Sequence, residues 1–118
     1  ELRRVVNAVL QMMDAYQGKS LILAATNHER ILDTAIWRRF DEAIEFPLPD
    51  RAQIKQLLAL KLRGVRRQFE IDDESVLDLF AQRSGADIER TVRRSVKRMI
   101  LRSQEFLTIK QNILAVIE

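Results

Sequence analysis

The sequence contains no cysteine and only one histidine, His28. The lack of cysteine excludes disulfides and thiolate metal ligands, and one histidine leaves too few ligands for a zinc centre. No apolar run approaches the roughly 20 residues needed to cross a bilayer, and no signal peptide is visible at the start. We therefore expect no metal site and no membrane span, and we expect a cytoplasmic protein.

What is present suits one ordinary domain rich in helices. The chain has 118 residues, of which 47% are hydrophobic and 31% charged, with a net charge of +3. A basic balance permits contact with nucleic acid or an acidic surface but does not require it. No aromatic residues interleave with the basic ones to stack on bases, so nucleic acid is an unlikely partner. The basic residues of the second half are Arg63, Arg66, Arg67, Arg90, Arg93, Arg94, Lys97, Arg98 and Arg102.

The first half of the chain has an α/β pattern. Apolar residues at three- and four-residue spacing predict a helix over Glu1 to Tyr16, which Gly18 can end. A compact apolar run over residues 21–25 predicts a buried strand, at whose tip lie Thr26 and Asn27. A second short strand is expected over residues 43–46, before the stop at residues 47–50.

The second half has the pattern of four short helices. Asp50 is an N-cap with Gln53 three residues later, and Gly64 can end that helix. Asp72 and Asp73 can cap a second helix, which closes near residues 84–85, and a third begins near residues 86–87. The fourth helix has Ile109, Ile113, Leu114 and Ile117 on its inner side, and the third has Ile88, Val92, Val96, Met99 and Ile100. Brief connections between such helices predict a bundle.

Three segments carry a family resemblance when they are taken in order. The runs AATN, LDTAIWRRFD and FPLPD closely resemble the second region of homology of the AAA ATPases, in the branch whose arginines precede a phenylalanine. The resemblance implies that Asn27 is the sensor 1 residue, which positions the attacking water. It also implies that Arg38 and Arg39 are arginine fingers, which reach the ATP site of a neighbouring subunit. The alternatives are a polar turn residue for Asn27 and solvated surface charge for the two arginines.

A second resemblance lies in the predicted bundle. Residues 84–88 read SGADI, which is similar to the sensor 2 region of AAA lids. It implies that Gly85 and Ala86 contact the adenine ring, and that Leu57 and Lys61 contact the base and ribose. Lys61 departs from the family pattern, and Ile54 stands where relatives commonly have arginine. The alternative for Gly85 is a helix C-cap with positive φ.

Together these resemblances imply an α/β remnant followed by an α-helical lid. Residues 1–49 would be the C-terminal part of the large subdomain of an AAA+ module, and residues 50–118 its lid. The complete protein would use ATP and Mg²⁺ to remodel a protein substrate, as a ring that the resemblance implies to be a hexamer. Because the sequence has no GxxxxGK[ST] phosphate loop, we expect it to be the C-terminal part of a longer chain, unable alone to bind ATP tightly or hydrolyse it. The alternative is a non-enzymatic basic helical module that binds a partner protein or nucleic acid.

Overall fold

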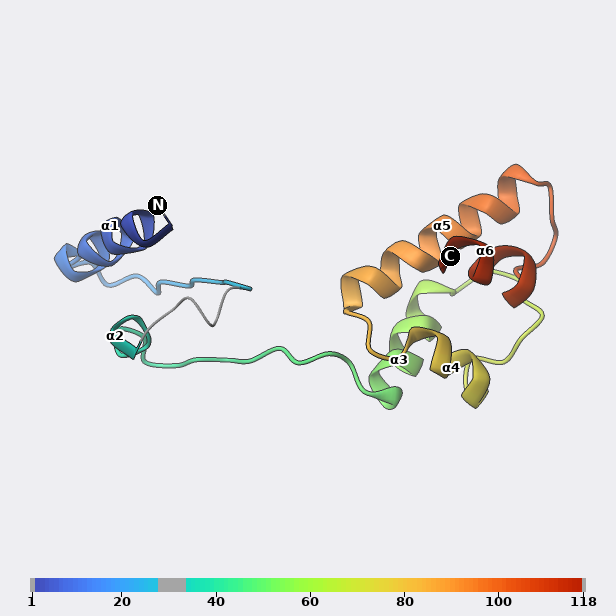
Figure 1. Cartoon of the computed structure of the whole chain (residues 1–118), viewed down its shortest axis with the longest axis horizontal. Coiled ribbons are helices and arrows are strands. Elements are labelled where there is room, and N and C mark those ends of the chain that lie inside the picture. Colours follow the sequence, from blue (N-terminus) through green and yellow to red (C-terminus); the bar gives the residue numbers. More distant parts are fainter. Residues whose placement is uncertain (1, 28–33, 118) are drawn as a thin grey trace. The chain divides into compact units, whose positions relative to one another are not determined.

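The computed structural model describes residues 2–27 and 34–117, which fall into two units (Figure 1). The first unit covers Glu1–Glu45 and the second covers Phe46–Glu118. His28 and Asp33 lie outside the described residues. No helix within the described ranges has the length and hydropathy needed to cross a membrane.

The first unit contains two helices in its described part. Helix α1 spans Leu2–Ala15 and helix α2 spans Thr34–Trp37. Leu10 is the buried apolar residue of α1, while Val5 and Val9 on the same helix remain exposed. After α1 the Tyr16 ring lies against Gly18, where an added Cβ would come within 2.0 Å of the Tyr16 hydroxyl oxygen. A side chain at position 18 would therefore force the ring to move.

The two predicted strands of the first unit do not form. Residues 21–25 and 43–46 are neither helix nor strand in the structure. Leu21 and Leu23 are 83% and 84% exposed, and Phe46 is 89% exposed. A strand exists only when another strand accepts and donates its backbone hydrogen bonds, and the described residues supply no such neighbour to either segment. The two segments have the apolar composition of buried strands, but the described residues form no sheet around them.

The second unit begins with two capped helices. Helix α3 spans Arg51–Lys61, and helix α4 spans Glu74–Phe80. The Asp50 side chain accepts from the Gln53 backbone N–H at 2.8 Å, and the Gln53 side chain accepts from the Asp50 backbone N–H at 2.9 Å. This reciprocal capping box fixes the start of α3 where the sequence predicts it. Asp73 caps α4 by accepting from the Ser75 backbone N–H at 2.9 Å.

Helix α5 spans Gly85–Leu101 and is the longest helix of the unit. The Ser84 hydroxyl accepts from the Asp87 backbone N–H at 3.1 Å, so Ser84 is the N-cap. Gly85 is therefore the first residue of α5, and its interpretation as a C-cap is wrong, because α4 ends earlier, at Phe80. Among the described glycines, the positive φ belongs to Gly64, at +79°.

The last helical segment is partly π-helical. The π-helical segment η1 covers Ile109–Ile113 and continues into α6, Leu114–Ile117. Its start is held by Asn112, whose side-chain oxygen accepts from the Thr108 backbone N–H at 2.8 Å. The loop before it pairs with the loop after α3 through one isolated parallel bridge, in which the Leu107 N–H donates to the Arg66 carbonyl at 2.8 Å. The sequence pattern does not predict this bridge.

One apolar core joins the helices of the second unit. It contains Ile54, Leu58, Leu62, Val76, Leu77, Phe80, Ile88, Val92, Leu107 and Ile113. Phe80, Leu58, Ile88 and Leu107 are fully buried. The prediction that Ile100 faces this core is wrong, since its side chain is 64% exposed. By position 100 the buried stripe of α5 has ended, and Val96 and Met99 are its last contributors.

Candidate functional site

Asn27 lies in a bend and is exposed. No strand leads to it, so the predicted place of this amide at the rim of a sheet is not reproduced by the described residues. The amide remains suitable for holding a water molecule, because it offers both donors and an acceptor without taking the proton. Its role as sensor 1 stays a prediction.

The two adjacent arginines follow α2 in a turn. The backbone N–H of Arg38 donates to the Thr34 carbonyl, and that of Arg39 donates to the Ile36 carbonyl, both at 3.1 Å. The Phe40 N–H continues the turn by donating to the Trp37 carbonyl at 3.2 Å. These hydrogen bonds fix the backbone that carries the two arginines.

The structure gives these two arginines different environments. The Nε of Arg39 donates to both carboxylate oxygens of Asp14, near the end of α1, at 3.1 Å each. The Arg39 side chain is 36% exposed and that of Asp14 is 55% exposed. Arg38 is exposed, and no described residue forms an ion pair or side-chain hydrogen bond with it. Arg39 is thus anchored within its own unit, while Arg38 is available to an outside group.

Sequence reasoning missed the role of Asp14. The residue stands 25 positions before Arg39, and nothing in the local pattern links an acid late in one helix to an arginine after another. The available signal was its position near the end of a predicted helix, where the negative end of the helix dipole repels a carboxylate and a nearby cation is favourable.

The candidate nucleotide contacts of the second unit lie between α3 and α5. A Cβ added to Gly85 would lie 4.0 Å from a terminal methyl of Leu57, with no other atom so close outside its own helix and chain neighbours. Gly85 and Ala86 are both exposed, and Leu57 is partly buried. The structure therefore brings Leu57 and Gly85 together at an open surface.

Lys61 lies one turn further along α3 and is already paired. Its ammonium group is 3.4 Å from a carboxylate oxygen of Glu89 on α5. The same Glu89 oxygen accepts from Arg93 at 2.8 Å. Lys61 thus links α3 to α5, and a contact with ribose would have to share or replace this ion pair.

Among the described residues, no group of three or more acids or histidines is placed to hold a metal ion.

Comparison with known proteins gives one family and several relatives. Residues 1–48 match the family described as "ATPase family associated with various cellular activities (AAA)". The matched range contains Asn27, Arg38 and Arg39, and it stops before α3.

Three relatives illustrate the range of similarity. An uncharacterized AAA family ATPase, y4kL, of Sinorhizobium fredii is 43% identical over 102 residues, which are 86% of this chain and 30% of the relative. The 26S proteasome regulatory subunit S10B homolog B of Arabidopsis thaliana is 33% identical over 75% of this chain and 23% of the relative. The ATP-dependent zinc metalloprotease FtsH 3 of Sphaerobacter thermophilus is 30% identical over 92% of this chain and 23% of the relative. The chain therefore spans less than a third of the length of each of these relatives, and the similarity extends into the second unit.

Proposed function

Because residues 1–48 place this chain in the AAA family of ATPases, we propose that it is the part of an ATP-driven remodelling machine that responds to bound nucleotide. In this proposal residues 1–49 belong to the large subdomain and residues 50–118 form the lid. The complete protein would assemble into a ring, which the family resemblance implies to be a hexamer, and would act on a protein substrate in the cytoplasm.

The observation that carries the proposal is the environment of the two arginines within the matched range. Arg38 has no carboxylate partner among the described residues, while Arg39 is bound to Asp14 through its Nε. We assign Arg38 as the finger that reaches the neighbouring subunit's triphosphate, and Arg39 as a positioning residue that fixes the turn. A guanidinium suits the first role because it stays charged and offers a planar fork to phosphate oxygens.

Asn27 would hold the attacking water near the terminal phosphate. Leu57, Gly85 and Ala86 would contact the base, and Lys61 the ribose. ATP with Mg²⁺ would supply the phosphoryl group whose transfer releases the free energy, and this chain would supply charge and orientation. Since phosphoryl transfer depends mostly on positioning and charge stabilisation, a finger supplied in trans is worth about a thousandfold or more in rate.

The test is a mixing experiment with the complete protein that carries this segment. Asn27→Ala should inactivate a subunit's own site, and Arg38→Ala should inactivate the site of its neighbour. Each variant alone should lose nearly all ATP hydrolysis. Random mixing should restore about a quarter of the sites, because a ring interface joins an intact Asn27 on one subunit to an intact Arg38 on the next.

Three outcomes separate the assignments. Recovery on mixing supports action in trans, and its absence shows that Arg38 acts in its own subunit or not at all. Unchanged turnover in the Arg38→Ala ring would contradict the finger and favour a binding module. Arg39→Lys is the matched control: it keeps the charge but loses the Nε contact with Asp14, so it should lower turnover less than Arg38→Ala.

A further inference from the structure

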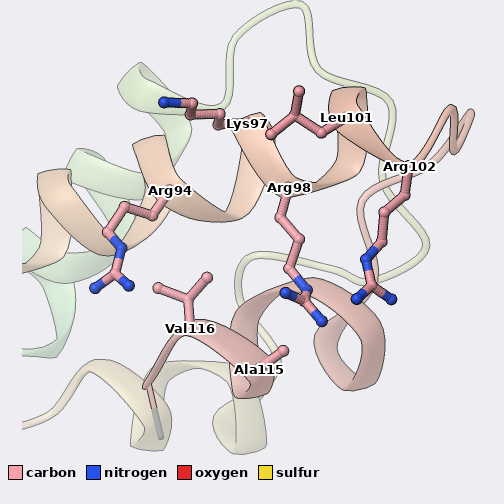
Figure 2. Close-up of a pocket in the computed structure, with 7 residues that line it drawn as sticks. All are labelled: Arg94, Lys97, Arg98, Leu101, Arg102, Ala115 and Val116. Carbon is pink, nitrogen blue, oxygen red and sulfur yellow. The ribbon is translucent and has the colours of Figure 1, made fainter.

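A basic groove lies between α5 and α6 (Figure 2). Its volume is about 330 Å³. Four cations line it, Arg94, Lys97, Arg98 and Arg102, together with the apolar residues Leu101, Ala115 and Val116. Figure 2 shows the Arg94 and Arg98 side chains extending from α5 toward Val116 and Ala115, and the Arg102 side chain extending to the same side from the residue after α5, while Lys97 points to the other side of the helix. None of these residues belongs to the proposed nucleotide site.

The acids of α5 do not neutralise this groove. Asp87 is paired with Arg90, and Glu89 with Arg93 and Lys61. These pairs occupy the first half of the helix. Within residues 2–27 and 34–117, no carboxylate lies within ion-pair distance of any of the four cations of the groove.

Helix electrostatics account for only part of this arrangement. A cation in the last turn is favourable because it opposes the helix dipole, an effect that fades beyond that turn. Arg98 lies in the last turn of α5, but Arg94 lies earlier and gains little from the dipole. Like charges four residues apart on a helix, such as Arg94 and Arg98, repel one another by a few tenths of a kcal/mol per pair. An anionic partner would relieve this repulsion.

Arg98 is held in place for such a partner. Its Nε donates to the Gln111 carbonyl in η1 at 3.1 Å. The two terminal nitrogens of the guanidinium remain for a bidentate acceptor, which is the geometry that a carboxylate or phosphate group prefers. Fixing the side chain in advance lowers the entropy that binding would cost.

The lining favours a peptide over a nucleic acid. No aromatic residue lines the groove, whereas single-stranded nucleic acid is bound by stacking its bases on aromatic side chains. The three apolar residues offer nothing to a phosphate backbone but can cover an apolar side chain. The volume lies near the lower end of the roughly 300–1,000 Å³ typical of ligand pockets, so it suits a few side chains.

We propose that the basic groove binds an acidic peptide segment of a partner protein, in which carboxylates alternate with apolar side chains. The carboxylates meet Arg94, Arg98 and Arg102, and an apolar side chain lies against Ala115 and Val116. This inference requires neither ATP nor a second subunit, so it stands or falls separately from the proposed function.

The experiment measures binding of fluorescein-labelled peptides to the 118-residue chain by fluorescence anisotropy, at about 50 mM salt to limit screening. The probe is the peptide Glu-Glu-Leu-Glu-Glu-Leu. One comparison peptide has serine in place of each leucine, and another has glutamine in place of each glutamate. An oligodeoxynucleotide of equal charge is the competing ligand. The probe should bind more tightly than all three.

Two double variants locate the site. Arg94→Gln with Arg102→Gln removes two cations of the groove, and it should weaken probe binding roughly tenfold, since each exposed ion pair is worth up to about 1 kcal/mol. Arg90→Gln with Arg93→Gln removes the same charge from the same helix outside the groove, and it should change binding less than about twofold. All four side chains are exposed, and far-ultraviolet circular dichroism checks that both variants fold.

The proposal is overturned by any of three results. One is the absence of probe binding by the unmodified chain. Another is equal weakening by the two double variants, which would show attraction to net charge alone. The third is tighter binding of the oligodeoxynucleotide than of the probe, with the same dependence on Arg94 and Arg102, which would make the groove a nucleic-acid site.

Discussion

Replacing Gly85 with alanine should raise stability and lower the affinity for nucleotide at the same time. The added Cβ would lie 4.0 Å from Leu57, which is an ordinary van der Waals contact, and φ at this position is not positive. Alanine therefore fits the first position of α5 without strain. It also has fewer unfolded conformations to lose than glycine, which is worth about 0.4–1 kcal/mol.

The expected shift can be measured in the 118-residue chain. For a domain of this size, 1 kcal/mol corresponds to roughly 4–8 °C in melting temperature, so Gly85→Ala should melt about 2–8 °C higher. Gly64→Ala is the matched control. Its φ is +79°, a conformation that costs a residue with a Cβ about 1–2 kcal/mol, so this variant should melt lower.

The functional half of the prediction uses the complete protein. The methyl group at position 85 would stand on the surface proposed for the base, so KM for ATP should rise severalfold while the chain is more stable. Gly64→Ala should leave KM unchanged, since no atom lies within 4 Å of its added Cβ. A lower melting temperature for Gly85→Ala would refute the packing argument, and an unchanged KM would refute the base contact.

Two further predictions concern helix caps of the second unit. Ser84→Ala removes the oxygen that accepts from the Asp87 N–H and should cost about 1 kcal/mol in urea unfolding, whereas Ser84→Asp should restore the cap; equal loss in both variants would mean that the cap does not matter. The pKa of Asp73 is lowered from 3.8, first by the hydrogen bond from the Ser75 hydroxyl and then by that from its backbone N–H. Because the pKa of this carboxyl is lower in the folded state than in the unfolded state, its charge stabilises the fold at pH values above the unfolded-state pKa. This stabilisation is lost as the pH falls through the folded-state pKa. The urea midpoints of the unmodified chain and of Asp73→Asn should therefore differ at about pH 6 and converge toward about pH 2, and a constant difference would contradict the lowered pKa.

The helices of the second unit were predictable because their signals are local. The capping box of Asp50 and Gln53 needs residues only three apart, and it marks the start of α3. The apolar spacing of Ile54, Leu58 and Leu62 identifies the buried face of that helix in the same way. Such signals depend on neighbours within one or two turns, so they operate whatever the rest of the chain does.

The strands were not predictable in this sense, because a strand is defined by its neighbour. The run that includes Leu21 and Leu23 has the composition of a buried strand, yet both side chains are more than 80% exposed. The apolar composition of this run shows that, as a strand, it would need other parts of a protein to cover both of its faces. Whether the requirement is met depends on other segments, and the described residues do not meet it.

The candidate sites show the same division between local and distant information. The sequence motifs single out Arg38 and Arg39 as a pair, but they cannot rank the two residues. What distinguishes them is the hydrogen bond between Arg39 and Asp14, and Asp14 lies 25 positions before Arg39. The basic groove likewise depends on α6 lying beside α5, and a helix pattern shows which residues are basic without showing what lies opposite them.

The proposed base contacts lie on the packing seam between α3 and α5, and this has a mechanical consequence. Leu57 packs against the core and also lies beside Gly85, while Lys61 and Glu89 join the same two helices one turn further on. Beneath this seam lie Leu58 and Ile88, both fully buried. Because closely packed interiors yield little to small displacements, a ligand at the seam would move α3 and α5 together with the core they share. Under the proposed function, a nucleotide bound there would thus shift the second unit as one body, which is what the proposed lid requires.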